Sequence, residues 1–206
     1  MACPLLTSPN KRALRKSVTA TLRSLPPTDV QEQSHAIAAR VLSLPSFAKS
    51  KTVSCYLSMP TGEVDTSPLV SEILRAGKSL FVPKIDRSTE GRMEFLKVYG
   101  EEDLQPFPSG LWGIREPEHT WGEHRRMSGV AFDRSLSRLG HGKGYYDRFI
   151  TRYTLLAGRQ RPLLGKVALA LREQVLEDGQ VPTADHDWKM DLIVSPDGVI
   201  GQDGSR

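Results

Sequence analysis

The chain has 206 residues, of which 38% are hydrophobic and 25% are charged, and its formal net charge is +4. These values are typical of one soluble globular domain, and the longest apolar run is too short to cross a bilayer, so we expect no membrane partner. The two cysteines, Cys3 and Cys55, have no metal-type spacing. They exclude a disulfide framework or a cysteine zinc site and favour a reducing compartment, the cytoplasm.

Residues 1–45 are predicted to form a basic N-terminal helical hairpin. Apolar residues at three-to-four spacing predict a helix over residues 10–25, ended by Pro26 and Pro27, and Thr28 can cap a second helix that ends before Pro45. No acidic residue precedes Asp29. From the residues alone, this basic segment fits a mitochondrial transit peptide or a solvated helix face.

Strands and helices alternate in the rest of the chain. We predict helices over residues 66–76 and 145–156, a helical turn over 172–176, and strands over 52–57, 79–85, 93–98, 164–171 and 191–195. Residues 100–126 are rich in Pro, Gly and Trp and are expected to be irregular. This alternation predicts one α/β domain with three layers, in which helices cover both faces of a central, largely parallel sheet.

The segment RLGHGKGYYD at residues 138–147 is the strongest chemical signal. Gly140, Gly142 and Gly144 alternate just before a predicted helix, so the backbone can approach a ligand closely and take conformations with φ > 0. Successive N–H groups at a helix N-terminus bind anions, and Arg138 and Lys143 add positive charge. The segment therefore predicts a phosphate-binding loop, with a flexible turn as the alternative.

The common nucleotide-binding motifs do not fit this segment. A Walker motif requires Ser or Thr after its lysine, whereas Gly144 follows Lys143, and Asp147 occupies the third glycine position of a G-x-G-x-x-G motif.

Residues 129–149, GVAFDRSLSRLGHGKGYYDRF, resemble the signature of the 5-formyltetrahydrofolate cyclo-ligase family, also called methenyltetrahydrofolate synthetase. Further segments agree with that family in chain order: KRALRK at 11–16, YLSMPTGEVDT at 56–66, LWGIREP at 111–117, and two segments within residues 168–200. The resemblance implies an ATP- and Mg²⁺-dependent reaction on the small-molecule substrate 5-formyltetrahydrofolate. In this reaction ATP activates the formyl oxygen, nitrogen 10 closes the ring, and 5,10-methenyltetrahydrofolate, ADP and phosphate are released.

The resemblance also implies roles for individual residues. Lys143 would lie nearest the transferred phosphoryl group. The residues expected to bind ATP are Lys11, Arg12, Arg15, Arg138, Leu139, Gly140, His141, Gly142, Lys143, Gly144, Tyr145 and Tyr146. Magnesium would be held by Asp147 and Asp191. Glu63 would bind the pterin, and the residues packing against the folate would be Leu57, Met59, Trp112 and Tyr145.

Without the resemblance, several of these residues have simpler interpretations. Asp147 also fits a first-turn carboxylate beside the helix dipole, and Asp191 fits a residue that merely flanks a strand. Glu63 lies in a turn-like GEVDT segment, and Trp112 suits a hydrophobic core equally well. The five histidines show no paired metal-binding spacing.

One segment departs from the family pattern. The family has an apolar strand ending in Pro-Gly before the GVAFD segment, whereas residues 125–128 of this chain read RRMS. No strand-like apolar run lies between Ile114 and Val130, so roughly one strand of about a dozen residues is missing. We expect this departure to lower thermal stability and activity.

Two other functions therefore remain open. A nucleotide- or folate-binding relative with impaired turnover would follow from the missing strand. A basic nucleic-acid-binding module would follow from the N-terminal charge, although no zinc, RRM or helix-turn-helix signature accompanies it. We expect a monomeric enzyme that binds no nucleic acid.

Overall fold

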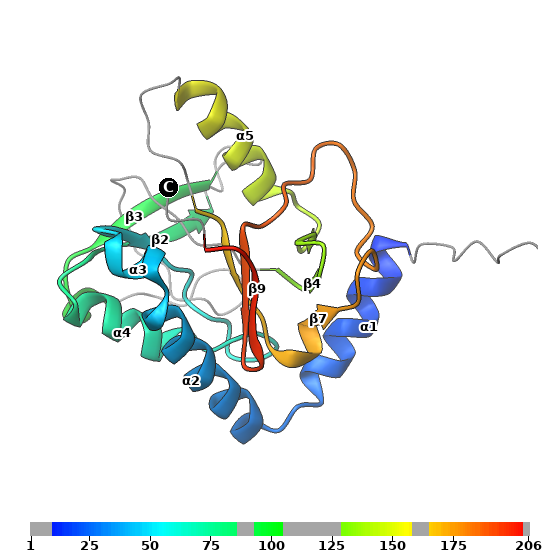
Figure 1. The fold of residues 1–206 in the computed structure, drawn as a ribbon, viewed down its shortest axis with the longest axis horizontal. Helices are drawn as coiled ribbons and strands as arrows, with labels where there is room; N and C mark the ends of the chain where they lie inside the picture. Colours follow the sequence, from blue (N-terminus) through cyan, green and yellow to red (C-terminus); the bar gives the residue numbers. More distant parts are fainter. Residues whose placement is uncertain (1–9, 86–92, 105–128, 158–164, 204–206) are drawn as a thin grey trace, which may run out of the picture.

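The protein is described from a computed structural model, which describes residues 10–85, 93–104, 129–157 and 165–203. Figure 1 shows its helices arranged around short strands. The α-helices are α1 (Lys11–Arg23), α2 (Pro27–Ser43), α3 (Pro45–Lys49), α4 (Ser67–Arg75) and α5 (Tyr145–Ala157), and the 3₁₀ helices are η1 (Glu101–Leu104) and η4 (Arg172–Gln174).

The strands form three sheets of three strands each within the described residues. Their orders are β1-β2-β3, β5-β4-β7 and β6-β8-β9. The strands are β1 (Thr52–Ser54), β2 (Ser79–Ile85), β3 (Met93–Val98), β4 (Ala131–Asp133), β5 (Arg138–Leu139), β6 (Val167–Leu169), β7 (Val175–Leu176), β8 (Leu192–Ser195) and β9 (Gly198–Gly201).

Each sheet combines one parallel and one antiparallel pair of strands. The parallel pairs are β1 with β2, β4 with β7, and β6 with β8, whereas β2–β3, β4–β5 and β8–β9 are antiparallel. The prediction of an α/β fold is confirmed at the level of a mixed fold with small sheets. Strand β9 was not predicted from the sequence, because its segment contains only two apolar residues between Gly198 and Gly201.

Alternating residues of the strands pack against different helices. Leu80 and Val82 of β2 belong to the main core, which also contains Ile37 of α2 and Ile73 of α4. Phe81, between them, belongs to a separate cluster that contacts the N-terminal end of α5. This alternation follows from the two-residue period of a strand, and it places α5 on the face of β2 opposite α2 and α4.

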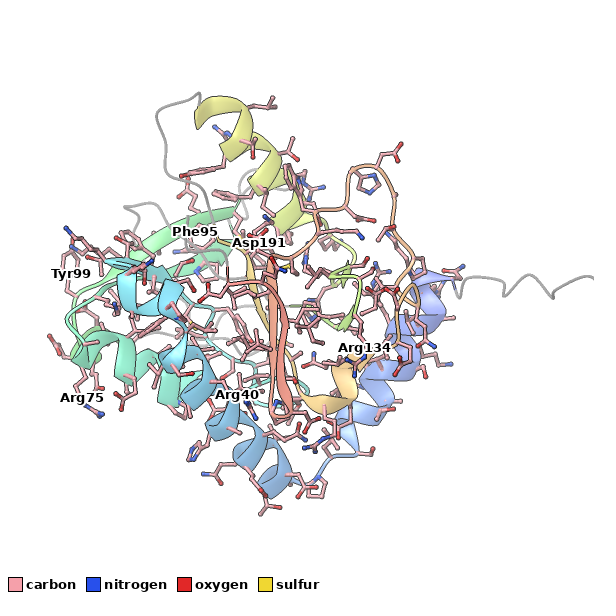
Figure 2. The ribbon with its side chains drawn as sticks, in the orientation of Figure 1. Arg40, Arg75, Phe95, Tyr99, Arg134 and Asp191 are labelled. Atoms are coloured by element: carbon pink, nitrogen blue, oxygen red, sulfur yellow. The ribbon has the colours of Figure 1, made fainter. Side chains whose placement is uncertain are left out.

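Helix α5 contacts all three of the described sheets through aromatic and aliphatic side chains. The Phe149 ring meets Phe95 of β3 edge to face, with ring centroids 5.3 Å apart. Ile150 packs with Phe132 of β4 and Ile193 of β8. Figure 2 shows Phe95 inside the fold, whereas Tyr99, just after β3, lies at the periphery with 75% of its surface exposed. These contacts fix the start of α5, where the glycine-rich segment ends.

Two N-terminal helices form where predicted but pack on different elements, and the expected Thr28 cap is wrong, because α2 begins at Pro27 and contains Thr28 in its first turn. Asn10 caps α1 by accepting a hydrogen bond from the Arg12 N–H at 2.9 Å, and Pro27 occupies the first turn of α2. Helix α1 packs against η4, whereas α2 packs against α4 and β8. Neither these helices nor the others in the described ranges have the length and apolarity needed to cross a membrane.

Two predictions fall outside the described residues. The position of the missing strand before Gly129 lies within residues 105–128, and Trp112 belongs to the same segment.

Candidate functional site

The glycine-rich segment connects β5 to α5 and turns sharply twice. Gly142 has φ = 98° and Gly144 has φ = 64°, which are left-handed conformations that favour glycine. Gly140 has no such requirement in its backbone, so the predicted conformational role of glycine holds at two of the three positions. The turns bring the loop to the N-terminus of α5, as an anion-binding loop requires.

Arg138 and Asp147 form a buried ion pair beneath this loop. The Arg138 Nη2 donates to the Asp147 Oδ2 at 2.7 Å, and the two side chains expose only 3% and 14% of their surface. The Arg138 guanidinium also lies 5.4 Å from the centre of the Tyr146 ring. Arg138 therefore supports the loop from below through Asp147 and Tyr146.

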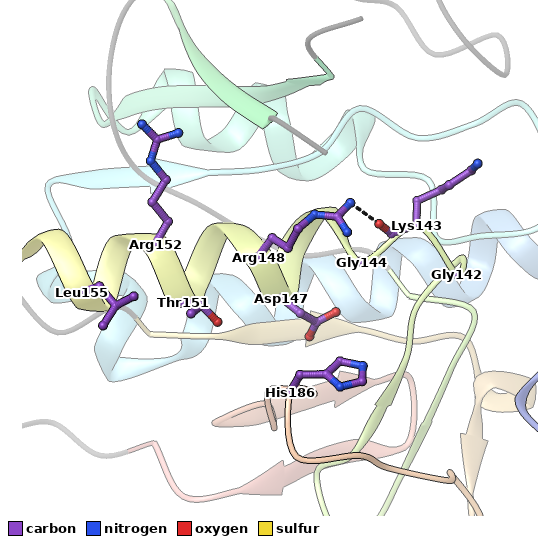
Figure 3. A pocket seen from close by; sticks show the side chains of 9 residues that line it. All are labelled: Gly142, Lys143, Gly144, Asp147, Arg148, Thr151, Arg152, Leu155 and His186. Carbon is purple, nitrogen blue, oxygen red and sulfur yellow. Dashed lines mark hydrogen bonds between the residues drawn. The ribbon is translucent and has the colours of Figure 1, made fainter. Parts of the chain in front are cut away.

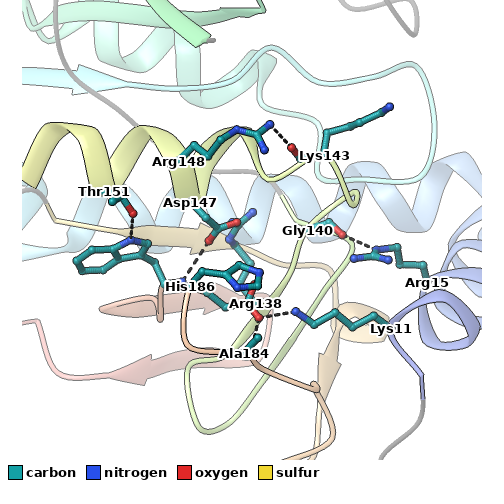
Figure 4. A network of polar contacts seen from close by, with 12 residues as sticks. Lys11, Arg15, Arg138, Gly140, Lys143, Asp147, Arg148, Thr151, Ala184 and His186 are labelled. Carbon is teal, nitrogen blue, oxygen red and sulfur yellow. Dashed lines mark hydrogen bonds and ion pairs between the residues drawn. The ribbon is translucent and has the colours of Figure 1, made fainter. Parts of the chain in front are cut away.

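Helix α1 brings Arg15 to the same loop and Lys11 to the segment 181–190, as Figure 4 shows. The Arg15 Nε donates to the Gly140 carbonyl at 2.7 Å, and Lys11 forms an ion pair with Asp187. Arg12, one residue beyond Lys11, is exposed to solvent. Lys11 and Arg15 are thus engaged with segments of the candidate site, and the predicted ATP contacts of Lys11, Arg12 and Arg15 stay predictions.

The segment 181–190 forms another wall of the site. The Trp188 N–H donates to the Asp147 Oδ1 at 3.1 Å, and the Trp188 indole donates to the Thr151 hydroxyl at 2.9 Å. The Ala184 N–H donates to the Asp187 Oδ2 at 2.7 Å. Partial burial alone would raise the pKa of Asp187, but the hydrogen bonds from Lys11 and Ala184 hold it below its ordinary value.

A pocket of about 730 Å³ opens between the loop, α5 and this segment (Figure 3). Asp147 and Thr151, one helical turn apart, line it from α5, and Lys143 extends from the loop on the far side of Gly144. Its lining residues are Gly142, Lys143, Gly144, Asp147, Arg148, Thr151, Arg152, Leu155 and His186. A pocket next to an anion-binding loop, with cations around it, suits a phosphorylated ligand.

The loop histidine has an altered protonation equilibrium. Desolvation by the surrounding protein lowers the pKa of His141, and the charges of Arg138 and Arg15 lower it further, although the residue as a whole is exposed. His141 is therefore favoured in its neutral form at neutral pH.

Three of the five predicted folate-binding residues lie at a second pocket of about 700 Å³, and the two pockets share no lining residue. Leu57, Met59 and Glu63 line it, together with residues from the end of α1 and from the starts of α2 and α4. Tyr145 lies elsewhere, at the start of α5, where it packs against the cluster of Phe81, Met93 and Phe95.

Glu63 is the acidic group with the clearest change in this second pocket. Its side chain is buried, and its Oε1 accepts the Met59 N–H at 2.6 Å. Burial raises the pKa of Glu63 to about 7, although the Met59 hydrogen bond opposes the increase. A carboxyl group that titrates near neutrality can either accept or donate a hydrogen bond to a polar ligand.

The two predicted magnesium ligands have different surroundings. Asp147 lines the first pocket, whereas Asp191 immediately precedes β8 (Figure 2) and is paired with Lys166. The Asp191 oxygens accept the Lys166 Nζ at 2.7 and 2.9 Å and the Lys166 N–H at 2.7 Å. Sequence reasoning passed over Asp187, although the HD pair at 186–187 lies within the same family-like segment.

Comparison with known proteins identifies the family. The model of the 5-formyltetrahydrofolate cyclo-ligase family matches residues 7–196, which includes both pockets and the loop. The chain belongs to this family. As a cyclo-ligase family member, it is 36% identical to the probable 5-formyltetrahydrofolate cyclo-ligase of Schizosaccharomyces pombe, with 92% of this chain and 97% of the relative covered. It is 35% identical to the Saccharomyces cerevisiae 5-formyltetrahydrofolate cyclo-ligase at the same coverage.

A solved structure supports the same family. The NMR structure of Aquifex aeolicus 5,10-methenyltetrahydrofolate synthetase is 31% identical to this cyclo-ligase family member, with a TM-score of 0.75 and coverage of 95% of this chain and 94% of that one. The alignment with the S. pombe protein has 204 positions, which is more than the 92% of the 206 residues of this chain that it includes. Some aligned positions are therefore residues of the relative that have no counterpart in this chain.

Proposed function

We propose that this chain catalyses the ATP-dependent cyclisation of 5-formyltetrahydrofolate to 5,10-methenyltetrahydrofolate, with release of ADP and phosphate. The observation that carries the proposal is the contact of Arg15 with the Gly140 carbonyl, which joins the basic N-terminal helix to the glycine-rich loop. Arg15 of α1 thereby holds the loop whose residues Gly142, Lys143 and Gly144 line one pocket. Membership of the cyclo-ligase family supports the reaction itself.

The proposed chemistry transfers the γ-phosphoryl group to the formyl oxygen of the substrate. Nitrogen 10 then attacks the activated carbon, and the original formyl oxygen leaves with the phosphate. The loop backbone at Gly142 and Gly144 would hold the phosphates, and Lys143 would neutralise charge on the transferred group. Arg15 and Lys11 would fix the position of the loop and the segment 181–190 relative to each other.

Magnesium fits one side of this pocket. Each Asp147 oxygen accepts one hydrogen bond and keeps a further lone pair, and the group borders the pocket. Mg²⁺ commonly uses one or two carboxylates together with water and substrate phosphates, and it would neutralise phosphate charge here. Asp187 uses its Oδ2 for both Lys11 and Ala184, and its Oδ1 accepts no hydrogen bond from the described residues, whereas both Asp191 oxygens accept from Lys166. Asp187 is therefore the better second carboxylate.

The second pocket would receive the folate. Glu63 lies buried in its wall and titrates near neutrality, so it can pair with the polar edge of a pterin ring, while Leu57 and Met59 offer apolar contact. Trp112 and Tyr145 remain further candidates for folate contact. The two pockets share no lining residue, so the proposal requires the substrates to bring their reacting atoms together between them.

The finer features of the fold and cellular context belong to this proposal. We place the enzyme in the cytoplasm as a monomer without a nucleic-acid partner. The engagement of Lys11 and Arg15 with the site argues against their use as a free basic face. We also infer that the three sheets derive from one central, largely parallel sheet, in which a strand would join β1 to β6.

The reaction gives a direct test. Purified protein is mixed with 5-formyltetrahydrofolate, Mg²⁺ and ATP, and the growth of methenyl absorbance is followed, with a control that lacks ATP. ATP-dependent product formation is expected. Binding of both ligands without product would instead identify a relative that has lost turnover.

Lys143→Ala should reduce turnover by about tenfold or more because it removes positive charge beside the transferred phosphoryl group. Lys49→Ala serves as the control, since Lys49 ends α3 and lines neither pocket. Near-wild-type kinetics in folded Lys143→Ala protein would remove this lysine from the mechanism.

A further inference from the structure

Asp133, at the end of β4, is a completely buried carboxyl group that lies outside both pockets. Its Oδ1 accepts three hydrogen bonds from within its own turn: the Ser135 N–H at 3.1 Å, the Ser135 hydroxyl at 2.7 Å and the Ser137 N–H at 3.2 Å. Its Oδ2 reaches out of the turn and accepts the Val181 N–H at 2.9 Å. The two oxygens therefore serve different segments.

The segment 181–190 is attached at both ends to this one turn. At its start, the Val181 N–H donates to the Asp133 side chain, and at its end the Met190 N–H donates to the Leu136 carbonyl at 2.8 Å. The Lys189 Nζ adds a bond to the Ser135 carbonyl at 3.0 Å. Leu136 has φ = 66°, the one left-handed non-glycine residue in the described ranges, so the turn itself adopts a constrained conformation.

Between these two attachments, the segment carries residues of the nucleotide site. His186 lines the first pocket, Asp187 pairs with Lys11 of α1, and the Trp188 N–H donates to Asp147. The same turn continues through β5 into Arg138 and the glycine-rich loop. The turn around Asp133 thus connects two walls of the pocket. Of its three links to the segment 181–190, the one to Val181 alone uses a side chain of the turn itself.

We propose that Asp133 is a positioning residue for the nucleotide site, acting through its Oδ2 bond to Val181. This inference rests on the proposed function, because it assigns the site to a magnesium nucleotide. The bond fixes where the segment 181–190 starts, and so it sets the position of Asp187 and Trp188 against Lys11 and Asp147. Loss of the bond should leave the turn intact and loosen this wall.

The substitution Asp133→Asn separates these two functions of the side chain. The amide oxygen will occupy the Oδ1 position because three hydrogen-bond donors surround that position. The amide nitrogen then takes the Oδ2 position and faces the Val181 N–H. Two donors then oppose each other and the bond is lost. We expect the dissociation constant for Mg·ADP to rise about fivefold, the effect of one lost hydrogen bond, and a smaller change in kcat than in KM for ATP.

Two control variants isolate this effect. Ser135→Ala removes the 2.7 Å bond inside the turn and keeps the Val181 attachment, so its affinity for Mg·ADP should remain near that of the wild type. Asp203→Ala removes a similar bond to the Ser46 N–H, 3.0 Å long, far along the chain from either wall. It should change stability without changing nucleotide affinity.

The experiment combines calorimetric titration of the full chain with Mg·ADP and amide hydrogen exchange. Support requires weaker binding in Asp133→Asn together with faster exchange confined to residues 181–190. Unchanged affinity, an equal loss in Ser135→Ala, faster exchange throughout the chain, or loss of cooperative folding would each overturn the positioning role. If the wild type fails to bind Mg·ADP, the proposed function fails, and unchanged local exchange in Asp133→Asn would still overturn the attachment.

Discussion

At the residue scale, hydrogen-bond partners distinguish carboxylates that the sequence presents alike. Asp147 lies in the first turn of α5 and Asp191 immediately precedes β8, both in the family-like segments. In three dimensions, Asp147 borders a pocket and keeps lone pairs, whereas Asp191 is bound by a lysine side chain and its N–H group. Asp187, which follows no periodic pattern, is drawn to the site by Lys11.

This difference predicts unequal responses to the same substitution. Asp147→Asn should raise the Mg²⁺ concentration for half-maximal activity by about tenfold, because the amide lacks the charge that a hard cation prefers. Asp187→Asn should have a similar effect, and Asp191→Asn, the matched control, should have little. Magnesium titrations of activity measure all three. A larger shift for Asp191→Asn than for Asp187→Asn would restore Asp191 as the second ligand.

Glu63 predicts a pH-dependent stability. Its pKa is about 7 in the folded protein, against an ordinary value of 4.5, so the folded state holds a proton that the unfolded chain has released between these values. This contribution to stability is complete below the ordinary pKa and is lost as pH rises through 7. Glu63→Gln removes the penalty of ionising a buried carboxyl group.

We therefore expect Glu63→Gln to gain stability relative to the wild type as pH rises from about 5 to 8, by up to about 3 kcal/mol. Denaturant unfolding at several pH values measures the difference. For Leu57→Ala, in the same pocket, the difference in stability from the wild type should not change with pH. Parallel curves for Glu63→Gln and the wild type would show that Glu63 titrates normally.

At the scale of elements, α1 is part of the site. Its residues Lys11 and Arg15 contact segments 176 and 125 positions further along the chain. A transit peptide would be removed, and these contacts would be removed with it. The structure therefore favours retention of α1 in the working protein.

Arg15→Ala should weaken ATP binding by about fivefold, and Arg12→Ala should weaken it less, because Arg15 holds the Gly140 carbonyl and Arg12 is exposed. Deletion of residues 1–16 should impair ATP binding further without moving the protein to another compartment. Mass spectrometry of the native protein gives an independent check. A mature N-terminus beyond Arg15 would rule out a role for α1 in catalysis.

At the scale of the whole molecule, the described strands form separate sheets. Strands β1 and β6 each pair on one side only within the described residues, yet Val53 and Ala168 are buried. A buried strand edge leaves backbone N–H and C=O groups that need partners, and each unmet group lowers stability. The family strand that we predict to be missing before Gly129 would supply such partners.

Inserting about a dozen apolar, strand-forming residues ending in Pro before Gly129 should raise the melting temperature and increase cyclo-ligase activity. Thermal unfolding and the methenyl absorbance assay measure the two effects. A Gly/Ser insertion of equal length controls for the added chain. Full activity with a cooperative, high-temperature transition in the present chain would show that the missing strand is unimportant.

The local sequence was sufficient to predict most helices and the character of the loop. These features depend on residues only a few positions apart, so a local pattern can indicate them. They are the cap at Asn10, the prolines at the start of α2 and the loop glycines with φ > 0. The same holds for the family, because its motifs follow in order along nearly all the sequence.

Tertiary structure alone decided which residues meet. Periodicity tells which face of a strand is buried, but it does not specify the neighbouring strand, so the three mixed sheets were not predictable from apolar patterns. Likewise, Asp187 and Asp191 carry the same charge in the sequence, and only the folded chain shows that Asp187 pairs with Lys11 of α1 whereas Asp191 pairs with Lys166. The sequence by itself determined the chemistry available to this protein, and long-range contacts determined which groups can use it together.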